Sequence, residues 1–224
     1  VIKSKNPNED KKPVSKNGTW HKDWNDQELL DASRIGAYHR DSKIFDVDFD
    51  DKEYNAHKFM DLLPPTFTIG KKVNGRAVAT HLIYRTKEKV KDYKKAQPLV
   101  ELLANTQTII AGVDRIIIND QEPIYYSAED IRAECKLIAT FSELYKHSKD
   151  ITNRNDFYYR LGGALARHTD VPMHQRIKYV ERLCELTNDN EVTNRVGCIE
   201  RQQQKFEEGA EDLYGELTSE LEER

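Results

Sequence analysis

The chain has 224 residues and a formal net charge of −4, with 33% of its residues charged and 38% hydrophobic. This length supports one large domain or a domain with an appendage, and the negative net charge argues against a uniformly basic nucleic-acid-binding protein. No apolar run approaches the roughly 20 residues that span a bilayer, and residues 1–7 lack the apolar core of a signal peptide. We therefore expect no membrane partner. The cysteines, Cys135, Cys184 and Cys198, are widely spaced, which favours free thiols over a zinc ribbon or a disulfide framework.

The N-terminal region predicts an extended arm that is followed by short elements. Residues 1–20 are polar and charged and contain prolines and a glycine, which is typical of a loop. Asn25 and Glu28 have the spacing of a capping box and predict the start of a short helix. Further along we expect two strands joined by a polar turn, then a helix that ends before Pro64; these elements cover 35–39, 43–49 and 51–63.

The second of these strands has the most informative pattern in the chain. Its residues alternate between apolar and acidic types: Phe45, Asp46, Val47, Asp48, Phe49 and Asp50. Alternate side chains of a strand point to opposite faces, so the three carboxylates share one face. Carboxylates this close repel each other unless cations neutralise them, and oxygen ligands of this kind suit Mg²⁺ or Mn²⁺. The alternative is a solvated acidic face that discourages aggregation at a sheet edge.

A basic hairpin is expected next. Strands at 66–69 and 77–86 flank a glycine-containing loop, and residues 71–95 hold nine basic against two acidic side chains. A local patch of this kind attracts phosphates even in an acidic chain, although a Lys-rich surface helix would give the same composition over 87–95. Short strands rich in β-branched residues follow, at 99–103, 106–113, 115–118 and 123–126.

The character of the sequence changes after residue 126. A capping box at Ser127–Asp130 opens the first of four expected helices, which cover 131–147, 153–168, 172–186 and 191–206. The predicted fold class is α+β, with a mixed or antiparallel sheet flanked by helices and then an all-α helical bundle. We divide the chain into a sheet domain, a connecting helix and a helical domain, with bounds of 1–126, 127–150 and 151–224.

Two further residues are candidates for the acidic site. Glu101 lies between apolar neighbours on an expected strand, and a carboxylate in that position is either buried and paired or a metal ligand. His81 alternates with apolar residues on the strand after the basic loop. A structural hydrogen-bonding role is the common alternative for such a histidine.

The order of these features resembles the archaeo-eukaryotic primase superfamily, the primase-polymerases of phages, plasmids and related mobile elements. The family's Asp-x-Asp motif is matched by Asp46 and Asp48, its Ser-x-His motif by 79–81 with Ala79 in place of Ser, and its acidic third strand by Glu101. Weaker similarities in the lead-in at 12–36, the strand after the third motif and the C-terminal helices extend the resemblance over most of 12–215.

The resemblance implies a template-dependent nucleotidyltransferase, a DNA primase or DNA polymerase that makes primers or extends DNA by two-metal catalysis. Its metal ligands would be Asp46, Asp48 and Glu101, which would hold two Mg²⁺ or Mn²⁺ ions. The incoming nucleoside triphosphate would contact His81, Lys71, Lys72 and Arg76. The single-stranded DNA template would contact Arg85, Lys87, Gln107, Arg154 and Arg160. The implied setting is replication of a phage or mobile element in the cytoplasm of a bacterial or phage-infected host cell, with a helicase domain or protein in cis or trans.

Rival interpretations share parts of this pattern. Asp46 and Asp48 also resemble the first motif of haloacid dehalogenase-like phosphatases, but that family has Thr or Val where this chain has Asp50. An EF-hand fails because Asp51 and His57 stand where Gly and Glu are needed. A non-catalytic nucleic-acid-binding replication protein remains an alternative. The chain has no P-loop motif, so it is not itself the helicase.

Overall fold

A computed structural model describes residues 34–39, 43–88, 99–104, 107–112, 114–148, 151–169 and 171–210. These residues have an α+β fold, as expected. The chain divides into two compact units, which we describe separately. The first unit comprises Val1–Lys52 and Pro64–Cys135, and the second comprises Glu53–Leu63 and Lys136–Arg224. The helix expected from Asn25, and the basic residues from Lys89 to Lys95, lie outside the described residues.

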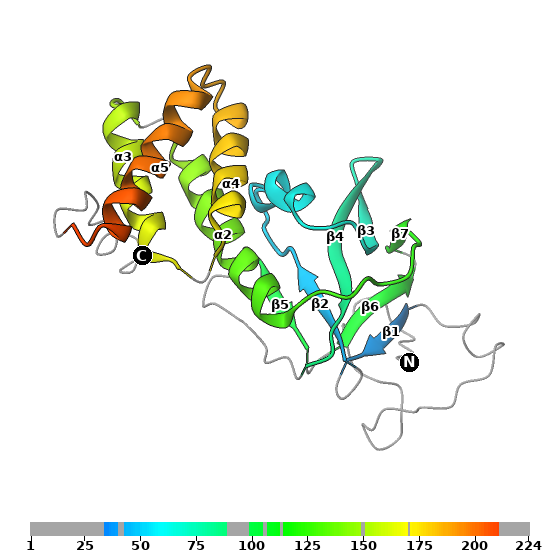
Figure 1. Ribbon diagram of the computed structural model, residues 1–224. Helices are drawn as coiled ribbons and strands as arrows, with labels where there is room; N and C mark the ends of the chain where they lie inside the picture. Colours follow the sequence, from blue (N-terminus) through cyan, green and yellow to red (C-terminus); the bar gives the residue numbers. More distant parts are fainter. Residues whose placement is uncertain are drawn as a thin grey trace. The chain divides into compact units, whose positions relative to one another are not determined.

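The first unit contains a five-stranded sheet and a separate two-stranded sheet. Strands of the larger sheet follow the order β5-β2-β4-β3-β7, whereas β1 pairs with β6. Every pairing between these named strands is antiparallel, and β2 lies between β5 and β4 (Figure 1). The strand bounds are β1 Arg34–Tyr38, β2 Ile44–Asp48, β3 Phe67–Val73, β4 Arg76–Arg85, β5 Glu101–Leu103, β6 Gln107–Gly112 and β7 Ile116–Asn119.

One face of the larger sheet is apolar and forms the core of this unit. The apolar half of the alternating pattern in β2 is completely buried, and its neighbours on β4 and β5 are almost as well buried; these residues are Phe45, Val47, Leu82, Tyr84 and Leu102. The rings of Phe45 and Tyr84 stack with centroids 5.6 Å apart. Each such side chain contributes about 2 kcal/mol when fully buried, so this face determines which way the acidic residues of β2 must point.

A β-bulge interrupts the pairing of β3 with β4 next to the acidic face. Ile69 pairs with His81 while the next residue, Gly70, pairs with Ala79, so Thr80 is the extra residue on β4. A bulge changes the direction of the side chains beside it on its own strand. Because the extra residue is on β4, β3 keeps its alternation past this point, and Ile69 and His81, which pair directly, face the same side.

One expected strand at the end of this sheet is not present. Residues 123–126 do not form a strand, because only an isolated bridge joins Tyr125 to Arg85; Pro123 has no N–H for a longer ladder. β1 does not pair with β2, the next strand in the chain, but with β6.

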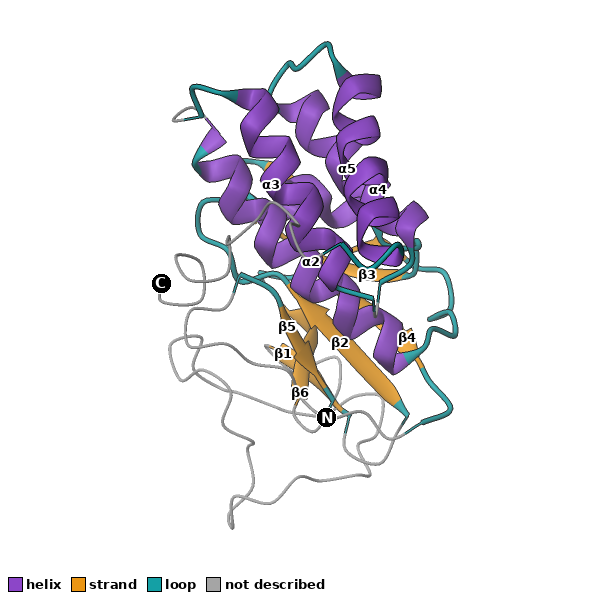
Figure 2. Cartoon of the chain, turned by 60° about the vertical axis from the view of Figure 1, so that its left-hand side comes forward, coloured by secondary structure: helices purple, strands orange, loops and turns teal. Residues whose placement is uncertain are grey.

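The second unit contains the helices, which pack side by side (Figure 2). α2 passes from the first unit into the second between Cys135 and Lys136. The helix expected at 51–63 is only a short 3₁₀ helix, η1, which begins after Tyr54, whose φ is 58°, and ends where Leu63 is extended before two prolines. The helix bounds are η1 Ala56–Leu62, α2 Ala128–Lys146, α3 Arg154–Arg167, α4 Met173–Leu186 and α5 Val192–Glu207. Within the described ranges, no helix has the length and hydropathy needed to cross a bilayer.

Aromatic rings and close helix contacts form the core of the second unit. Phe59 of η1, Phe141 of α2 and Tyr179 of α4 form a cluster with centroids 5.4 to 6.2 Å apart. The small residue Gly162 lets α3 approach α5 closely, since a Cβ at this position would lie 3.2 Å from the carbonyl oxygen of Cys198. Gly162 thus serves the close packing of α3 against α5.

Candidate active site

The antiparallel register brings Glu101, Asp48 and His81 into one row across the sheet, which we call the acidic row. Asp48 on β2 pairs directly with Glu101 on β5 and with His81 on β4. Directly opposed residues of antiparallel strands have Cβ atoms about 5 Å apart on the same face. Asp46 lies two residues before Asp48, so it shares this face. Residues from three separate parts of the sequence therefore meet on one side of the sheet.

The imidazole of His81 lies between the two aspartates of β2. Its Nδ1 is 3.0 Å from Oδ2 of Asp46 and 3.4 Å from Oδ1 of Asp48. Asp46 is completely buried, while the side chain of Asp48 is 21% exposed. One imidazole N–H thus faces two carboxylates and offsets part of their mutual repulsion.

Burial and crowding alter the proton affinity of this cluster. The pKa of Asp48 is raised to about 7, first by burial and then by the charges of Asp46, Asp50 and Glu101, against the opposing effect of His81. Burial works against a charged His81, but Asp46 and Asp48 together raise its pKa above the usual value. The site therefore concentrates negative charge in poorly solvated surroundings, which favours a cationic ligand.

Only one of the two carboxylate oxygens of Asp46 has hydrogen-bond partners among the described residues. Its Oδ2 accepts hydrogen bonds from Thr108 Oγ1 and from His81 Nδ1. Its Oδ1 is buried and has no hydrogen-bond partner in the described part of the chain. A buried carboxylate oxygen without a donor is costly unless a ligand completes its coordination.

These observations test whether the site suits a divalent cation. Carboxylate oxygens are the donors that Mg²⁺ and Mn²⁺ prefer, and the unpartnered Oδ1 of Asp46 is such a donor. Among the described residues, no group of three or more His, Cys, Asp and Glu side chains is close enough together to hold an ion as it stands. The backbone thus aligns the expected ligands, and the chemistry of the donors fits, while His81 Nδ1 lies close to both aspartates of β2.

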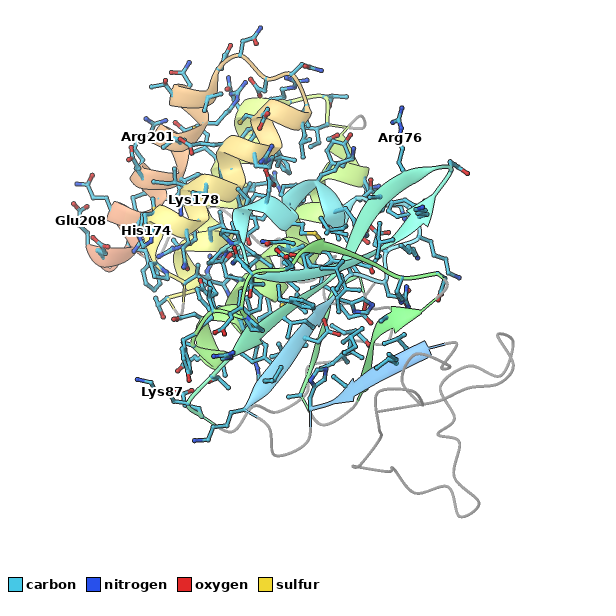
Figure 3. The ribbon with its side chains drawn as sticks, turned by 90° about the vertical axis from the view of Figure 1, so that its right-hand side faces the viewer. Arg76, Lys87, His174, Lys178, Arg201 and Glu208 are labelled. Carbon is cyan, nitrogen blue, oxygen red and sulfur yellow. The ribbon has the colours of Figure 1, made fainter. Side chains whose placement is uncertain are left out.

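The basic residues expected around the nucleotide fall on different faces. Ile69 pairs with both His81 and Ile117, so Lys71, two residues further along β3, lies on the face of the acidic row about 7 Å beyond it. By the same alternation Lys72 lies on the opposite face. Arg76 is about 15 Å from His81 along β4, and Figure 3 shows it projecting from the tip of the β3–β4 hairpin.

Arg115 is a further basic residue on this face. It lies two residues before Ile117, directly before β7, so alternation places it on the same side as Lys71 and His81. Its charge lowers the pKa of His81, which the aspartates raise, so the two side chains are within electrostatic range. The guanidinium Nε is buried and makes no hydrogen bond to any described residue.

The residues expected on the template lie at the other end of the sheet or outside the described side chains. Arg85 ends β4 and lies 3.4 Å from Glu122 in an exposed ion pair. Lys87 is exposed just beyond it, at the end of β4 opposite Arg76 (Figure 3). Gln107 begins β6, but its side chain lies outside the described part of the structure.

The two arginines expected on nucleic acid in the helical unit already have acidic partners. Arg154 Nη1 lies 3.4 Å from the buried carboxylate of Asp189, and Arg160 Nε donates to Asp156 at 2.9 Å. A phosphate would have to displace or share these contacts. The structure therefore gives Arg154 and Arg160 a local role in ion pairs on the helices.

Sequence reasoning missed three residues that contact or flank the acidic row. These are Thr108, His39 and Arg115. Thr108 stands in a β-branched run that looks like ordinary strand, and His39 follows a short apolar strand without a motif. Only Arg115 gave a local signal, as a basic residue directly before the apolar run 116–118.

No significant match to the chain is found among protein-family models, curated proteins or solved structures. The interpretation of the acidic row therefore depends on its residues and their geometry.

Proposed function

We propose that this chain is a template-dependent nucleotidyltransferase of the primase-polymerase type, which makes or extends primers on single-stranded DNA. The observation that supports this most directly is the cross-strand row of Glu101, Asp48 and His81, with Asp46 on the same face. This alignment depends on two separate strand pairings, β2 with β4 and β2 with β5. If it were accidental, both registers would have to place these residues together by chance.

In this proposal Asp46, Asp48 and Glu101 hold Mg²⁺ or Mn²⁺. Divalent cations in such a site neutralise charge on the attacking hydroxyl and on the leaving pyrophosphate. The raised pKa of Asp48 and the unpartnered oxygen of Asp46 support cation binding, because both reflect negative charge that the described residues leave incompletely compensated.

The basic residues beside the row suit the triphosphate of the incoming nucleotide. His81 would donate to a phosphate oxygen from within the row, and Lys71 and Arg115 would act from one step further along β3 and β7. Arg76, at the hairpin tip, could reach only a flexible or distant part of the ligand. Arg85 and Lys87, at the far end of β4, would contact the backbone of the template, so binding should weaken as salt concentration rises.

Neither rival activity gains support from a particular observation. In haloacid dehalogenase-like phosphatases the nucleophilic Asp follows a strand of a parallel sheet, whereas β2 has antiparallel neighbours on both sides. A purely binding protein would have no need for a buried carboxylate oxygen without a partner, which costs about 1–3 kcal/mol.

The test is incorporation of labelled nucleotides on a single-stranded DNA template with Mn²⁺. The parent chain should yield short products, and Asp46→Asn and Asp48→Asn should reduce them at least 100-fold without loss of DNA binding. Asp120→Asn, a change at an exposed acid after β7, is the matched control and should remain active. Activity of the Asp46 and Asp48 variants equal to the parent would refute the proposal. So would DNA binding without any product, or release of phosphate from a small ester in its place.

A further inference from the structure

A chain of hydrogen bonds runs from the two-stranded sheet to the acidic row. Nε2 of His39 lies 2.7 Å from Oγ1 of Thr108, and the Thr108 hydroxyl donates to Oδ2 of Asp46. All three side chains are almost completely buried, with exposed fractions of 2%, 2% and 0%. The contact joins β1 and β6 to β2, which belong to different sheets.

The strand pairing explains how these residues meet. His39 comes directly after β1, whose last pair joins Tyr38 to the first residue of β6, Gln107. Thr108 is the next residue of β6 and so lies diagonally across from His39. β5, which precedes β6 in the chain, ends at Leu103, and Leu103 pairs with Asp46. One segment of chain therefore supplies Glu101 to the acidic row and then Thr108 to the carboxylate beside it.

The direction of each hydrogen bond follows from the donors that are present. A deprotonated carboxylate only accepts, so the single hydroxyl proton of Thr108 must point to Asp46. The Thr108 oxygen is then an acceptor, and His39 must donate to it from Nε2. His81 donates from Nδ1 at 3.0 Å to the same Oδ2. Both imidazoles thus have a defined proton position, and two donors are fixed on one oxygen of Asp46.

The consequence concerns the other oxygen of Asp46. With Oδ2 held by two donors, the carboxylate cannot rotate without breaking a buried hydrogen bond. Oδ1 keeps its lone pairs, because no donor in the described ranges reaches it. This is the arrangement found around ligating carboxylates, whose second oxygen is commonly held by a hydrogen bond from an outer residue.

We propose that Thr108 and His39 are positioning residues that fix the carboxylate of Asp46 so that its Oδ1 binds the divalent cation. The proposal rests on the cation site of the proposed function. It assigns the two-stranded sheet a role in metal affinity, through a hydroxyl and an imidazole that do not themselves touch the metal or the nucleotide.

Direct titration of the full chain with Mn²⁺, without nucleotide or template, tests this role. Thr108→Val keeps the shape of the side chain and removes the hydroxyl, so the dissociation constant for Mn²⁺ should rise at least 10-fold. Thr108→Ser restores the hydroxyl and should bind within about 2-fold of the parent. Thr68→Val is the matched control. Thr68 is also a buried strand threonine, but its hydroxyl donates to the carbonyl of Thr66, so Mn²⁺ affinity should not change.

His39 provides a second, independent pair of variants. His39→Gln retains an amide donor near the position of Nε2 and should keep most of the affinity, whereas His39→Leu should weaken Mn²⁺ binding in the same direction as Thr108→Val. Thermal unfolding in EDTA shows which variants are folded. If Thr108→Val does not fold, the comparison of Mn²⁺ binding by His39→Gln and His39→Leu tests the positioning role.

The outcomes separate this proposal from the proposed function. If Asp46→Asn abolishes Mn²⁺ binding while Thr108→Val and His39→Leu bind as the parent does, the positioning role is wrong and the metal site stands. If Asp46→Asn also binds Mn²⁺ with parental affinity, the metal site itself is wrong. Loss of affinity in Thr108→Val with recovery in Thr108→Ser supports the positioning role.

Discussion

His81 and Asp48 pair across β4 and β2, with Nδ1 of the imidazole 3.4 Å from Oδ1 of the carboxylate. The same imidazole is closer to Asp46. One imidazole is therefore shared by two carboxylates and does not fully offset the charge of either. The raised pKa of Asp48, caused first by burial and then by neighbouring carboxylates, means that its charged form is disfavoured in the folded chain. The metal-free fold therefore contains unfavourable charge at the residues on which the proposed activity depends.

Replacing Asp48 should consequently increase stability while it removes activity. Asp48→Asn deletes a poorly compensated charge, so at pH 8 in EDTA it should raise the thermal midpoint by about 2–4 °C, which corresponds to about 1 kcal/mol for a chain of this size. The parent should gain stability on addition of Mn²⁺, because a ligand that binds only the folded state stabilises it. The variant should lose most of that gain. Differential scanning calorimetry measures both effects, and a variant that is less stable than the parent in EDTA would contradict this explanation.

The two nitrogens of His81 should have separable roles. His81→Asn places an amide nitrogen near the position of Nδ1, so the contact with the aspartates and the stability in EDTA should be largely retained. The ring nitrogen Nε2 is lost in this variant, and KM for the incoming nucleotide should rise about 10-fold, since a hydrogen bond to a charged group contributes about 1.5–3 kcal/mol.

His81→Gln is the complementary variant. Its amide nitrogen extends toward the position of Nε2 and leaves the aspartates without their donor, so it should unfold at a lower temperature than the parent in EDTA. Steady-state kinetics together with thermal unfolding distinguish the two. If His81→Asn and His81→Gln have equal effects on KM and on the thermal midpoint, Nδ1 and Nε2 do not have these separate roles.

Much of the acidic face follows from local sequence. Residues 45–50 alternate strictly, so the shared face of Asp46 and Asp48 requires only that this segment becomes a strand with its apolar side buried. The family resemblance then predicted that His81 and Glu101 belong to the same site. The register that places both opposite Asp48 is non-local, but burial of Phe45, Val47 and the apolar partners on β4 and β5 constrains it.

Features that depend on contacts between distant segments could not be predicted. His39 and Thr108 are 69 residues apart, and only the pairing of β1 with β6 brings them together. The same holds for Arg115, whose side of the sheet depends on bulges in the pairing of β3. The prolines after Leu63 end the element expected at 51–63 where the sequence predicts, but the left-handed backbone at Tyr54 confines it to the shorter η1.

The two neighbouring lysines of β3 provide a matched pair for the nucleotide site. Lys71 shares the face of the acidic row and Lys72 lies on the other face. Lys71→Gln should raise KM for the nucleotide about 10-fold by removal of a charge-assisted hydrogen bond. Lys72→Gln makes the same chemical change and should have little effect. Arg115→Gln should resemble Lys71→Gln. If Lys72→Gln is the more damaging variant, the triphosphate lies on the opposite side of the hairpin.

A buried ion pair in the helical unit predicts how stability depends on pH. Arg195 Nε donates to Asp189 at 3.0 Å, and the side chains of both residues are at most 5% exposed. Burial alone would raise the pKa of Asp189, but the hydrogen bond from the backbone N–H of Glu191 and the contact with Arg195 hold it below its usual value. A carboxyl group whose pKa is lower in the folded than in the unfolded chain stabilises the fold above the unfolded value of about 3.9, and this stability is lost as pH falls through the folded value.

Asp189→Asn should therefore destabilise the chain by about 3 kcal/mol at pH 6, because Arg195 loses its buried counter-charge and keeps the contact of its Nη2 with the more exposed Glu191. The difference from the parent should shrink as pH falls below about 4, where Asp189 takes up a proton in the unfolded chain while its lowered pKa keeps it ionised in the folded chain. Urea unfolding followed by helical circular dichroism at pH 6 and pH 3 measures both values. Asp156→Asn breaks an exposed pair with Arg160 in the same unit and should change stability by less than about 1 kcal/mol at either pH. A loss in Asp189→Asn that stays constant between pH 6 and pH 3 would mean that shape and hydrogen bonding, and not the charge of Asp189, stabilise this part of the chain.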